Sequence, residues 1–286
     1  MLAMTWTTLI DATTLRSLLE AGAPPPVVID TGFDLANTGA GERDYEAGHL
    51  PGAHYWHIDR DLSGAKTGRN GRHPLPDREA FAMRAGALGI GPATQVVVYD
   101  AHGGVYASRA WWLLRWIGHA AVAVLDGGRA SWLAAGGTLT AEPPLAPAAP
   151  APCPGSGSLA PALGADVLAR RLGAAPLIDA RVPERFRGEV EPLDAKAGHI
   201  PGALNRPFRD NLGAGARFKT TEQLRAEFTP LLGAAAPADV VHYCGSGVTA
   251  CHNLLAMEVA GLAGSALYPG SWSEWSSDPA RSIALG

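Results

Sequence analysis

The sequence is poor in cysteine, with only Cys153, Cys244 and Cys251 among 286 residues. An odd and low number argues against a disulfide framework and favours a reducing compartment. Cys244 and Cys251 also lack the paired spacing of a metal site. We therefore expect a cytoplasmic protein that needs neither a metal ion nor an organic cofactor.

Long apolar runs and an excess of either charge are also lacking. No run reaches the roughly 18 apolar residues of a membrane-spanning helix, and residues 1–9 do not have the pattern of a secretory signal. The net charge of −4 argues against nucleic acid or an anionic membrane as a partner. With 47% hydrophobic residues, the chain can form large cores, and its length predicts about two domains.

An internal repeat supports this number of domains. The segment AGHLPGA at residues 47–53 recurs as AGHIPGA at residues 197–203, and VVVYD at 96–100 recurs as VVHYC at 240–244. A period this long predicts duplicated domains rather than a solenoid. Because the repeated His49 and His199 occur in both halves, we interpret them as structural residues that hydrogen-bond a neighbouring loop.

The proline-rich stretch between the two halves predicts a linker. It spans residues 141–158, contains Cys153 and has no periodic pattern. We therefore expect an N-terminal domain at residues 1–140 and a C-terminal domain at residues 159–286.

Short apolar runs alternate with helical patterns in each half. This alternation predicts an α/β fold in which a mostly parallel sheet is flanked by helices. Ligands of such sheets bind beyond the carboxyl ends of the strands, where Asp100 and Cys244 fall. In the first half we expect helices over residues 12–21, 78–88, 106–116 and 129–135, and strands over residues 27–30, 53–55, 95–99 and 122–125.

The segment HYCGSGVTA at residues 242–250 places a cysteine between a short strand and a helix expected over residues 249–260. Gly245 and Gly247 allow the loop to turn its backbone N–H groups toward one point, and the helix N-terminus adds partial positive charge there. Both effects favour an anion, and the natural anion is the Cys244 thiolate. Since the thiolate is the nucleophilic form of cysteine, the pattern predicts a catalytic nucleophile.

The residues CGSGVTA at 244–250 resemble the active-site loop of the tandem-domain rhodanese-type sulfurtransferases, in the form found in 3-mercaptopyruvate sulfurtransferases. The resemblance covers nearly the whole chain. Thiosulfate sulfurtransferases usually carry basic residues in this loop, whereas the loop here is neutral, which favours 3-mercaptopyruvate as the donor. The resemblance implies a persulfide on Cys244 and substrate binding by Gly245, Gly247, Val248 and Thr249.

The repeat also indicates which half performs the chemistry. Asp100 stands where the second half has Cys244, and an aspartate cannot carry a sulfur atom. The first half is therefore expected to be catalytically silent. In the tandem rhodanese family, the N-terminal domain likewise helps to wall the site.

A small anionic sulfur donor needs a cationic partner, and Arg185 can hold a carboxylate through its planar guanidinium group. By resemblance, Arg185 matches the first of two substrate-binding arginines of mercaptopyruvate sulfurtransferases. The second usually follows a proline, but here Leu193 follows Pro192. Lys196 is a candidate replacement, and thiosulfate stays open as the alternative donor.

The resemblance further implies a proton relay. In the family, an aspartate and a histidine approach the loop serine, and the matching residues here are Asp59, His73 and Ser246. A carboxylate orients an imidazole, the imidazole polarises a hydroxyl, and the hydroxyl can deliver a proton to the departing pyruvate enolate. We expect these three residues to be catalytic together with Cys244.

The resulting hypothesis is a sulfurtransferase that passes sulfur through Cys244 to a thiol acceptor, such as a thioredoxin-like protein, or to cyanide. Two alternatives belong to other classes. A cysteine phosphatase would need an arginine where Ala250 stands, in a loop that binds phosphate. A non-enzymatic persulfide carrier would need Cys244 but no proton relay.

Overall fold

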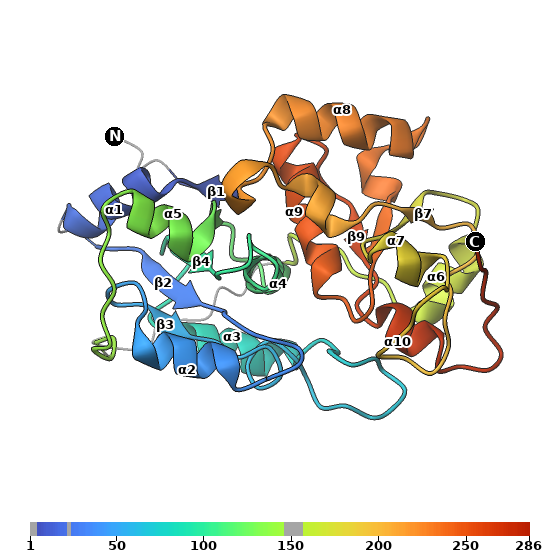
Figure 1. Ribbon diagram of the computed structural model, residues 1–286, viewed down its shortest axis with the longest axis horizontal. Coiled ribbons are helices and arrows are strands. Elements are labelled where there is room, and N and C mark those ends of the chain that lie inside the picture. The colour runs from blue at the N-terminus through green and yellow to red at the C-terminus, as the bar shows by residue number, and fades with distance from the viewer. Residues whose placement is uncertain (1–4, 22–23, 146–156) are drawn as a thin grey trace. The chain divides into compact units, whose positions relative to one another are not determined.

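The computed structural model describes residues 5–21, 24–145 and 157–286. Cys153 and most of the predicted linker lie outside these ranges. The described residues form two compact units, each built on one parallel sheet (Figure 1). Unit 1 comprises Met1–Leu62, Pro76–Leu159 and Ala214–Phe218, and unit 2 comprises Ser63–Leu75, Ala160–Gly213 and Lys219–Gly286.

Unit 1 contains a five-stranded parallel sheet in the order β1-β5-β4-β2-β3. The two central apolar strands are buried along their whole length, because helices cover both faces of the sheet. The strands are β1 (Leu9–Ile10), β2 (Val27–Asp30), β3 (His54–Tyr55), β4 (Val96–Tyr99) and β5 (Val122–Leu125).

The helices of unit 1 divide between the two faces of its sheet. Leu15 of α1 and Trp132 of α5 share a core with Val97 of β4, while α4 packs against β4 and β5. Alternate strand residues such as Val98 point away from that core and are also buried, which indicates a second core on the opposite face. The helices are α1 (Ala12–Glu20), α2 (Ala40–Ala47), α3 (Arg78–Ala87), α4 (Ala107–Trp116) and α5 (Gly128–Ala134).

The predicted parallel α/β fold is confirmed, and the expected elements of the first half end within about a residue of the observed ones. Two elements of unit 1, β1 and α2, were not predicted. Strand β1 has only two residues, too few to produce a pattern. Helix α2 contains Gly41, a poor helix former whose missing side chain allows close approach to Gly32.

Unit 2 repeats this plan with a four-stranded parallel sheet in the order β7-β6-β8-β9. Leu168 of α6 and Trp272 of α10 share a core with Val241 of β8, and α9 packs against β8 and β9. The strands are β6 (Leu177–Asp179), β7 (Leu204–Asn205), β8 (Val241–Tyr243) and β9 (Ala266–Leu267), and the helices are α6 (Ala165–Arg171), α7 (Pro183–Phe186), α8 (Thr221–Leu232), α9 (Thr249–Val259) and α10 (Ser271–Trp275).

The repeated histidines have the structural role that their repetition predicts. His49 hydrogen-bonds the carbonyls of Tyr45 and Glu142 and stacks on the Tyr45 ring. His199 hydrogen-bonds the carbonyl of Phe186 and stacks on its ring. Each histidine thus ties the turn before a strand to a neighbouring segment of its own unit.

None of the helices in the part of the chain that the structure describes is long and apolar enough to cross a membrane.

Candidate active site

Cys244 lies directly after β8, at the carboxyl end of the central strand pair of unit 2. The cysteine is buried, with 2% of its surface exposed, and its Sγ accepts a hydrogen bond from the backbone N–H of Gly247 at 3.1 Å. Helix α9 begins at Thr249, so its N-terminus follows the loop. A backbone N–H and a helix N-terminus both stabilise negative charge on this sulfur.

Gly247 is required by the shape of this loop. Its φ of +80° is in the left-handed region, and a Cβ at this position would lie 2.4 Å from the carbonyl oxygen of Pro269. No residue with a side chain fits such a backbone without displacing the loop. Glycine at position 247 thus allows the backbone conformation in which its N–H points at the Cys244 sulfur.

The first turn of α10 also holds the cysteine loop. The Cys244 N–H donates to Ser271 Oγ at 3.1 Å, while the Trp272 and Ser273 N–H groups donate to the carbonyls of Cys244 and Gly245, both at 2.9 Å. Three backbone groups of two adjacent residues are thus restrained by one neighbouring segment. This restraint preorganises the position of the sulfur.

The structure brings together two of the three predicted relay residues. His73 Nδ1 and Ser246 Oγ form a hydrogen bond of 2.7 Å, although 173 positions separate them in the chain. Both residues are buried. The contact is possible because the segment Ser63–Leu75 belongs to unit 2.

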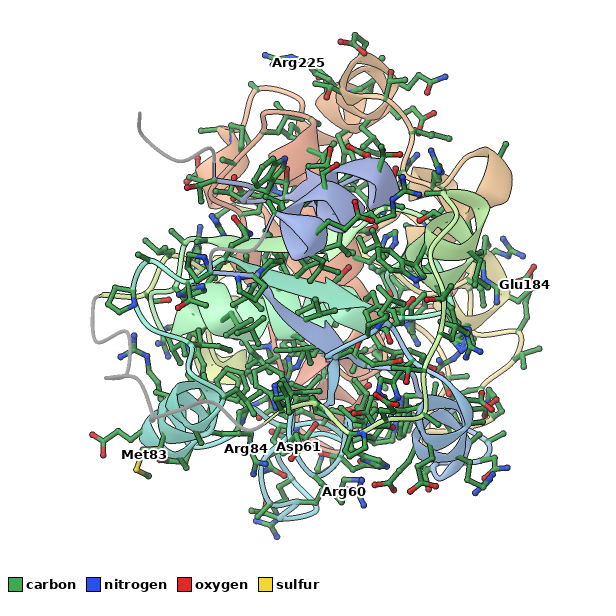
Figure 2. The ribbon with its side chains drawn as sticks, turned by 90° about the vertical axis from the view of Figure 1, so that its left-hand side faces the viewer. Arg60, Asp61, Met83, Arg84, Glu184 and Arg225 are labelled. Atoms are coloured by element: carbon green, nitrogen blue, oxygen red, sulfur yellow. The ribbon has the colours of Figure 1, made fainter. Side chains whose placement is uncertain are left out.

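Asp59, the third predicted residue, belongs to unit 1, and its pairing with His73 stays a prediction. Its segment is fixed within that unit: the Asp59 N–H donates to His57 Nδ1 at 3.1 Å, and Asp61 accepts from the His57 N–H at 2.7 Å. Asp61 also pairs with Arg84 of α3 (Figure 2). Arg60 pairs with Glu42 of α2 at 2.6 Å. Asp59 is therefore carried by an ordered turn.

Arg185, the predicted substrate-binding arginine, is held by two carboxylates. Its Nη2 donates to Glu191 at 2.6 Å and to Asp194 at 3.4 Å, and its Nε donates to Glu191 at 3.2 Å. These contacts fix the guanidinium group, which otherwise would lose rotational freedom on binding a ligand. Lys196, the candidate replacement for a second arginine, is exposed.

A second arginine does reach this position, and it comes from a different segment than the family pattern suggests. Arg72 pairs with Asp194. Its Nη2 lies 2.9 Å from the position that a Cβ would occupy if Gly245 had a side chain. Arg185 Nη1 lies 3.4 Å from the same place. Two guanidinium groups therefore converge beside the residue that follows Cys244.

Arg72, Asp194 and Glu191 were not predicted from the sequence. A signal for Arg72 exists, since it directly precedes the predicted catalytic histidine. The family pattern places the second arginine near Pro192, and a local motif does not record contacts made through folding. The loop residues Val248 and Thr249 lie at the N-terminus of α9, and their binding of substrate stays a prediction.

Two other ionisable side chains near Cys244, those of His242 and Cys251, are buried. Burial lowers the pKa of His242 to about 3, so this imidazole is neutral at physiological pH, and it contacts Met257 in the core. The Cys251 thiol is buried in α9 and donates to the Gly247 carbonyl at 3.3 Å. Within the described ranges, no group of three or more His, Cys, Asp or Glu side chains is arranged to hold a metal ion.

Asp100 occupies the equivalent position in unit 1, directly after β4. Its carboxylate accepts hydrogen bonds from four backbone N–H groups, those of His102, Gly104, Tyr106 and Ala107, at 2.7 to 3.0 Å. The same strand-loop-helix geometry therefore surrounds Asp100 in unit 1 and Cys244 in unit 2. In unit 1 the surrounded group is a carboxylate of the chain itself.

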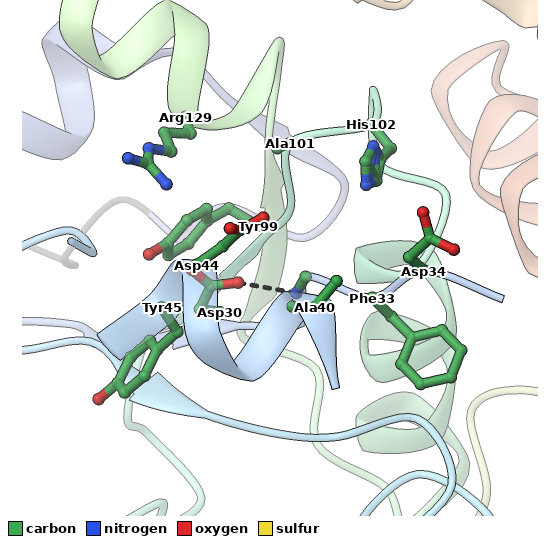
Figure 3. Close-up of a pocket in the computed structure, with 12 residues that line it drawn as sticks. Asp30, Phe33, Asp34, Ala40, Asp44, Tyr45, Tyr99, Ala101, His102 and Arg129 are labelled. Carbon is green, nitrogen blue, oxygen red and sulfur yellow. Dashed lines mark hydrogen bonds between the residues drawn. The ribbon is translucent and has the colours of Figure 1, made fainter. Parts of the chain in front are cut away.

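A pocket of about 100 Å³ opens beside this loop in unit 1 (Figure 3). It is lined by Asp30, which accepts from the Gly32 N–H at 2.7 Å, and by Tyr99 and Arg129. Burial raises the pKa of Asp30 to about 6. In unit 2 the residue equivalent to Gly32 is Arg181, whose guanidinium pairs with the Asp179 carboxylate at 2.6 Å.

A family model described as a rhodanese-like domain matches residues 11–135 and 164–278 of this chain. A probable 3-mercaptopyruvate sulfurtransferase of Pseudomonas aeruginosa is 47% identical over 268 residues, with 92% of this chain and 93% of the relative covered. A putative thiosulfate sulfurtransferase of Mycobacterium tuberculosis is 37% identical over 294 residues, with 97% of both chains covered.

The fold is also similar to that of a solved relative. A 3-mercaptopyruvate sulfurtransferase from Leishmania major superposes with a TM-score of 0.81 at 29% identity, over 94% of this chain and 74% of that chain.

Proposed function

Because this chain belongs to the rhodanese-like domain family, we propose that it transfers a sulfur atom from 3-mercaptopyruvate to a thiol or to cyanide through a persulfide on Cys244. The protein is a sulfurtransferase. The single observation that carries the assignment of the site is the buried Cys244 sulfur, which accepts a backbone N–H beside the hydrogen-bonded Ser246 and His73.

In the first half-reaction, the Cys244 thiolate attacks the sulfur of the donor. The carbon–sulfur bond breaks, its electron pair moves to carbon, and pyruvate leaves as an enolate. The Ser246 hydroxyl delivers a proton to the enolate carbon, and His73 Nδ1 restores the proton to Ser246. The product is free pyruvate, and the transferred sulfur stays on Cys244 as a persulfide.

In the second half-reaction, an acceptor thiolate attacks the outer sulfur of the persulfide. The sulfur–sulfur bond breaks, the Cys244 thiolate is released and the acceptor carries the persulfide. Cyanide as the acceptor gives thiocyanate by the same displacement. A thioredoxin-like protein is a suitable thiol acceptor because its active-site cysteine is already partly ionised near neutral pH.

Thiosulfate is the second candidate donor, since the relative in Mycobacterium tuberculosis is named a putative thiosulfate sulfurtransferase. Its leaving group is sulfite, which requires no proton. The arginine pair beside Gly245 favours 3-mercaptopyruvate, because a guanidinium fork matches the two oxygens of a carboxylate.

The test is steady-state sulfur transfer with both donors side by side, together with the intact mass of the protein after each donor. We expect a higher kcat/KM with 3-mercaptopyruvate and a mass increase of one sulfur atom, which is lost in Cys244→Ser. A sulfur that stays bound in Cys244→Ser would place the nucleophile elsewhere. Preference for thiosulfate would make the second candidate the correct donor.

A further inference from the structure

Two guanidinium groups approach Gly245, and in each the nearest nitrogen is not one that bonds a carboxylate partner. Arg72 uses Nη1 for Asp194, and its Nη2 lies 2.9 Å from the place of a Cβ on Gly245. Arg185 uses Nε and Nη2 for Glu191 and Asp194, and its Nη1 lies 3.4 Å from the same place. The space left by the missing side chain of Gly245 is thus bordered by N–H donors from both arginines.

The carboxylates lie behind the arginines rather than between them and solvent. The Glu191 and Asp194 side chains are 4% and 7% exposed, whereas those of Arg72 and Arg185 are 27% and 16% exposed. A carboxylate bound to one edge of a guanidinium fixes its plane and leaves the other edge available. The two acids therefore act as positioning residues for the arginines.

Arg72 is also fixed through its backbone. Its N–H donates to Ser273 Oγ at 3.0 Å, and Ser273 is the residue whose N–H holds the Gly245 carbonyl. Gly71, the preceding residue, has a φ of +83°, and a Cβ there would lie 2.7 Å from the Gly270 carbonyl oxygen. The same segment therefore positions Arg72 and the loop that carries Cys244.

We propose that Arg72 is the second arginine that binds the carboxylate of the donor, opposite Arg185, in place of the arginine that is absent after Pro192. This inference rests on the proposed function and deepens it by naming the specificity-determining residue. Because His73 is the next residue, one short segment supplies both the carboxylate contact and the group behind the proton donor. The carboxylate of the donor and the carbon that receives the proton are then both positioned by adjacent residues of one backbone segment.

The direct test is binding of 3-mercaptopyruvate to a Cys244→Ala background, in which no chemistry intervenes, measured by isothermal titration calorimetry. Loss of a charged hydrogen-bond donor in Arg72→Ala should weaken binding about 10- to 100-fold. Arg72→Lys keeps the positive charge but not the planar guanidinium group, so its affinity for 3-mercaptopyruvate should lie between those of the Arg72 protein and the Arg72→Ala variant. Arg187→Ala is the matched control, since Arg187 is exposed and paired with Glu189 on the surface.

Unchanged affinity in Arg72→Ala, or a loss equal to that of Arg187→Ala, would overturn the proposal. Circular dichroism of each variant establishes whether it is folded. If Arg72→Ala does not fold, the affinity of Arg72→Lys provides the test. Arg185→Ala, made in the Cys244→Ala protein with and without Arg72→Ala, completes a double-mutant cycle. Two arginines on one carboxylate should give a clear interaction energy, while additive losses would assign Arg72 to a different part of the donor.

Kinetics in the Cys244 protein separate this inference from the proposed function. In Arg72→Ala we expect KM for 3-mercaptopyruvate to rise more than kcat falls, and the selectivity over thiosulfate to decrease. A fall in kcat alone would mean that Arg72 acts through His73 and does not bind the donor. Absence of a persulfide with either donor in the unmodified protein would instead refute the proposed function, whatever the binding results show.

Discussion

The hydrogen bond between His73 and Ser246 is the residue-level feature that we expect to distinguish between donors. Expulsion of an enolate requires a proton, whereas expulsion of sulfite does not. We therefore expect His73→Ala to lower kcat with 3-mercaptopyruvate by about 10²–10⁴-fold and to change kcat with thiosulfate much less. The measurement is a parallel pair of steady-state assays with one thiol acceptor, and equal losses with both donors would remove His73 from the proton relay.

Asp30 in unit 1 and Asp179 in unit 2 are equivalent buried carboxylates. Two residues later, unit 2 has Arg181, which pairs with Asp179, whereas unit 1 has Gly32. Burial raises the pKa of Asp30 to about 6, above the ordinary value of about 3.9 that applies in the unfolded chain. The folded state therefore binds the proton more strongly, so this group stabilises the fold less as the pH rises from about 4 to 6. The resulting cost is fully present above about pH 6.

Asp30→Asn should consequently raise the free energy of unfolding near pH 7.5, by about 2 kcal/mol, because it removes a buried charge and keeps the acceptor for Gly32. Thermal unfolding between pH 4 and 8 measures this, and the gain should shrink toward pH 4. Asp179→Asn is the matched control and should destabilise the protein, since it leaves Arg181 without its closest partner. A loss of stability in Asp30→Asn at neutral pH would contradict the expectation.

At the scale of the element, the loop between β8 and α9 depends on a close approach that only glycine allows. Gly247→Ala should abolish most of the activity, since the new Cβ would meet the Pro269 carbonyl and the Gly247 N–H would leave Cys244. The control is Gly202→Ala, whose φ is +79° but whose Cβ would have no atom within 4 Å. Both variants carry similar backbone strain, about 1–2 kcal/mol, and only the first should lose persulfide formation.

The measurement for this pair is intact mass after a short exposure to 3-mercaptopyruvate, with the melting temperature determined in parallel. Equal loss of persulfide in both variants would show that backbone strain, rather than the position of the loop, limits the reaction.

At the scale of the whole molecule, the duplication has produced two strand-to-helix loops that surround different side chains, Asp100 in unit 1 and Cys244 in unit 2. Asp100→Ala removes a carboxylate from four backbone N–H groups and should lower the free energy of unfolding by about 2–4 kcal/mol. Because we expect unit 1 to perform no chemistry, persulfide formation on Cys244 should persist in the folded variant. Denaturant unfolding and intact mass test the two parts separately, and loss of the persulfide in a folded variant would contradict the silent role.

Much of the molecule could be predicted from sequence because the determining interactions are local. The alternation of β4 with α4 follows from apolar runs and helical periods, and the repeat of residues 47–53 at 197–203 reveals the duplication directly. Cys244 was predicted as the nucleophile because a glycine-containing strand-to-helix turn is itself a local pattern. Helix α2 was missed because its Gly41 is selected by a contact with Gly32, which no local pattern records.

Sequence by itself therefore determined the family, the parallel fold and the unequal halves, and it predicts which cysteine is the nucleophile. Only the tertiary structure decided which charged side chains meet at that cysteine. Arg72 and His73 reach Gly245 and Ser246 because a segment that leaves unit 1 packs into unit 2, and a distant chain segment carries no signature of its destination. The proposed second arginine, Arg72, has no signature along the chain, since electrostatic contacts act through space.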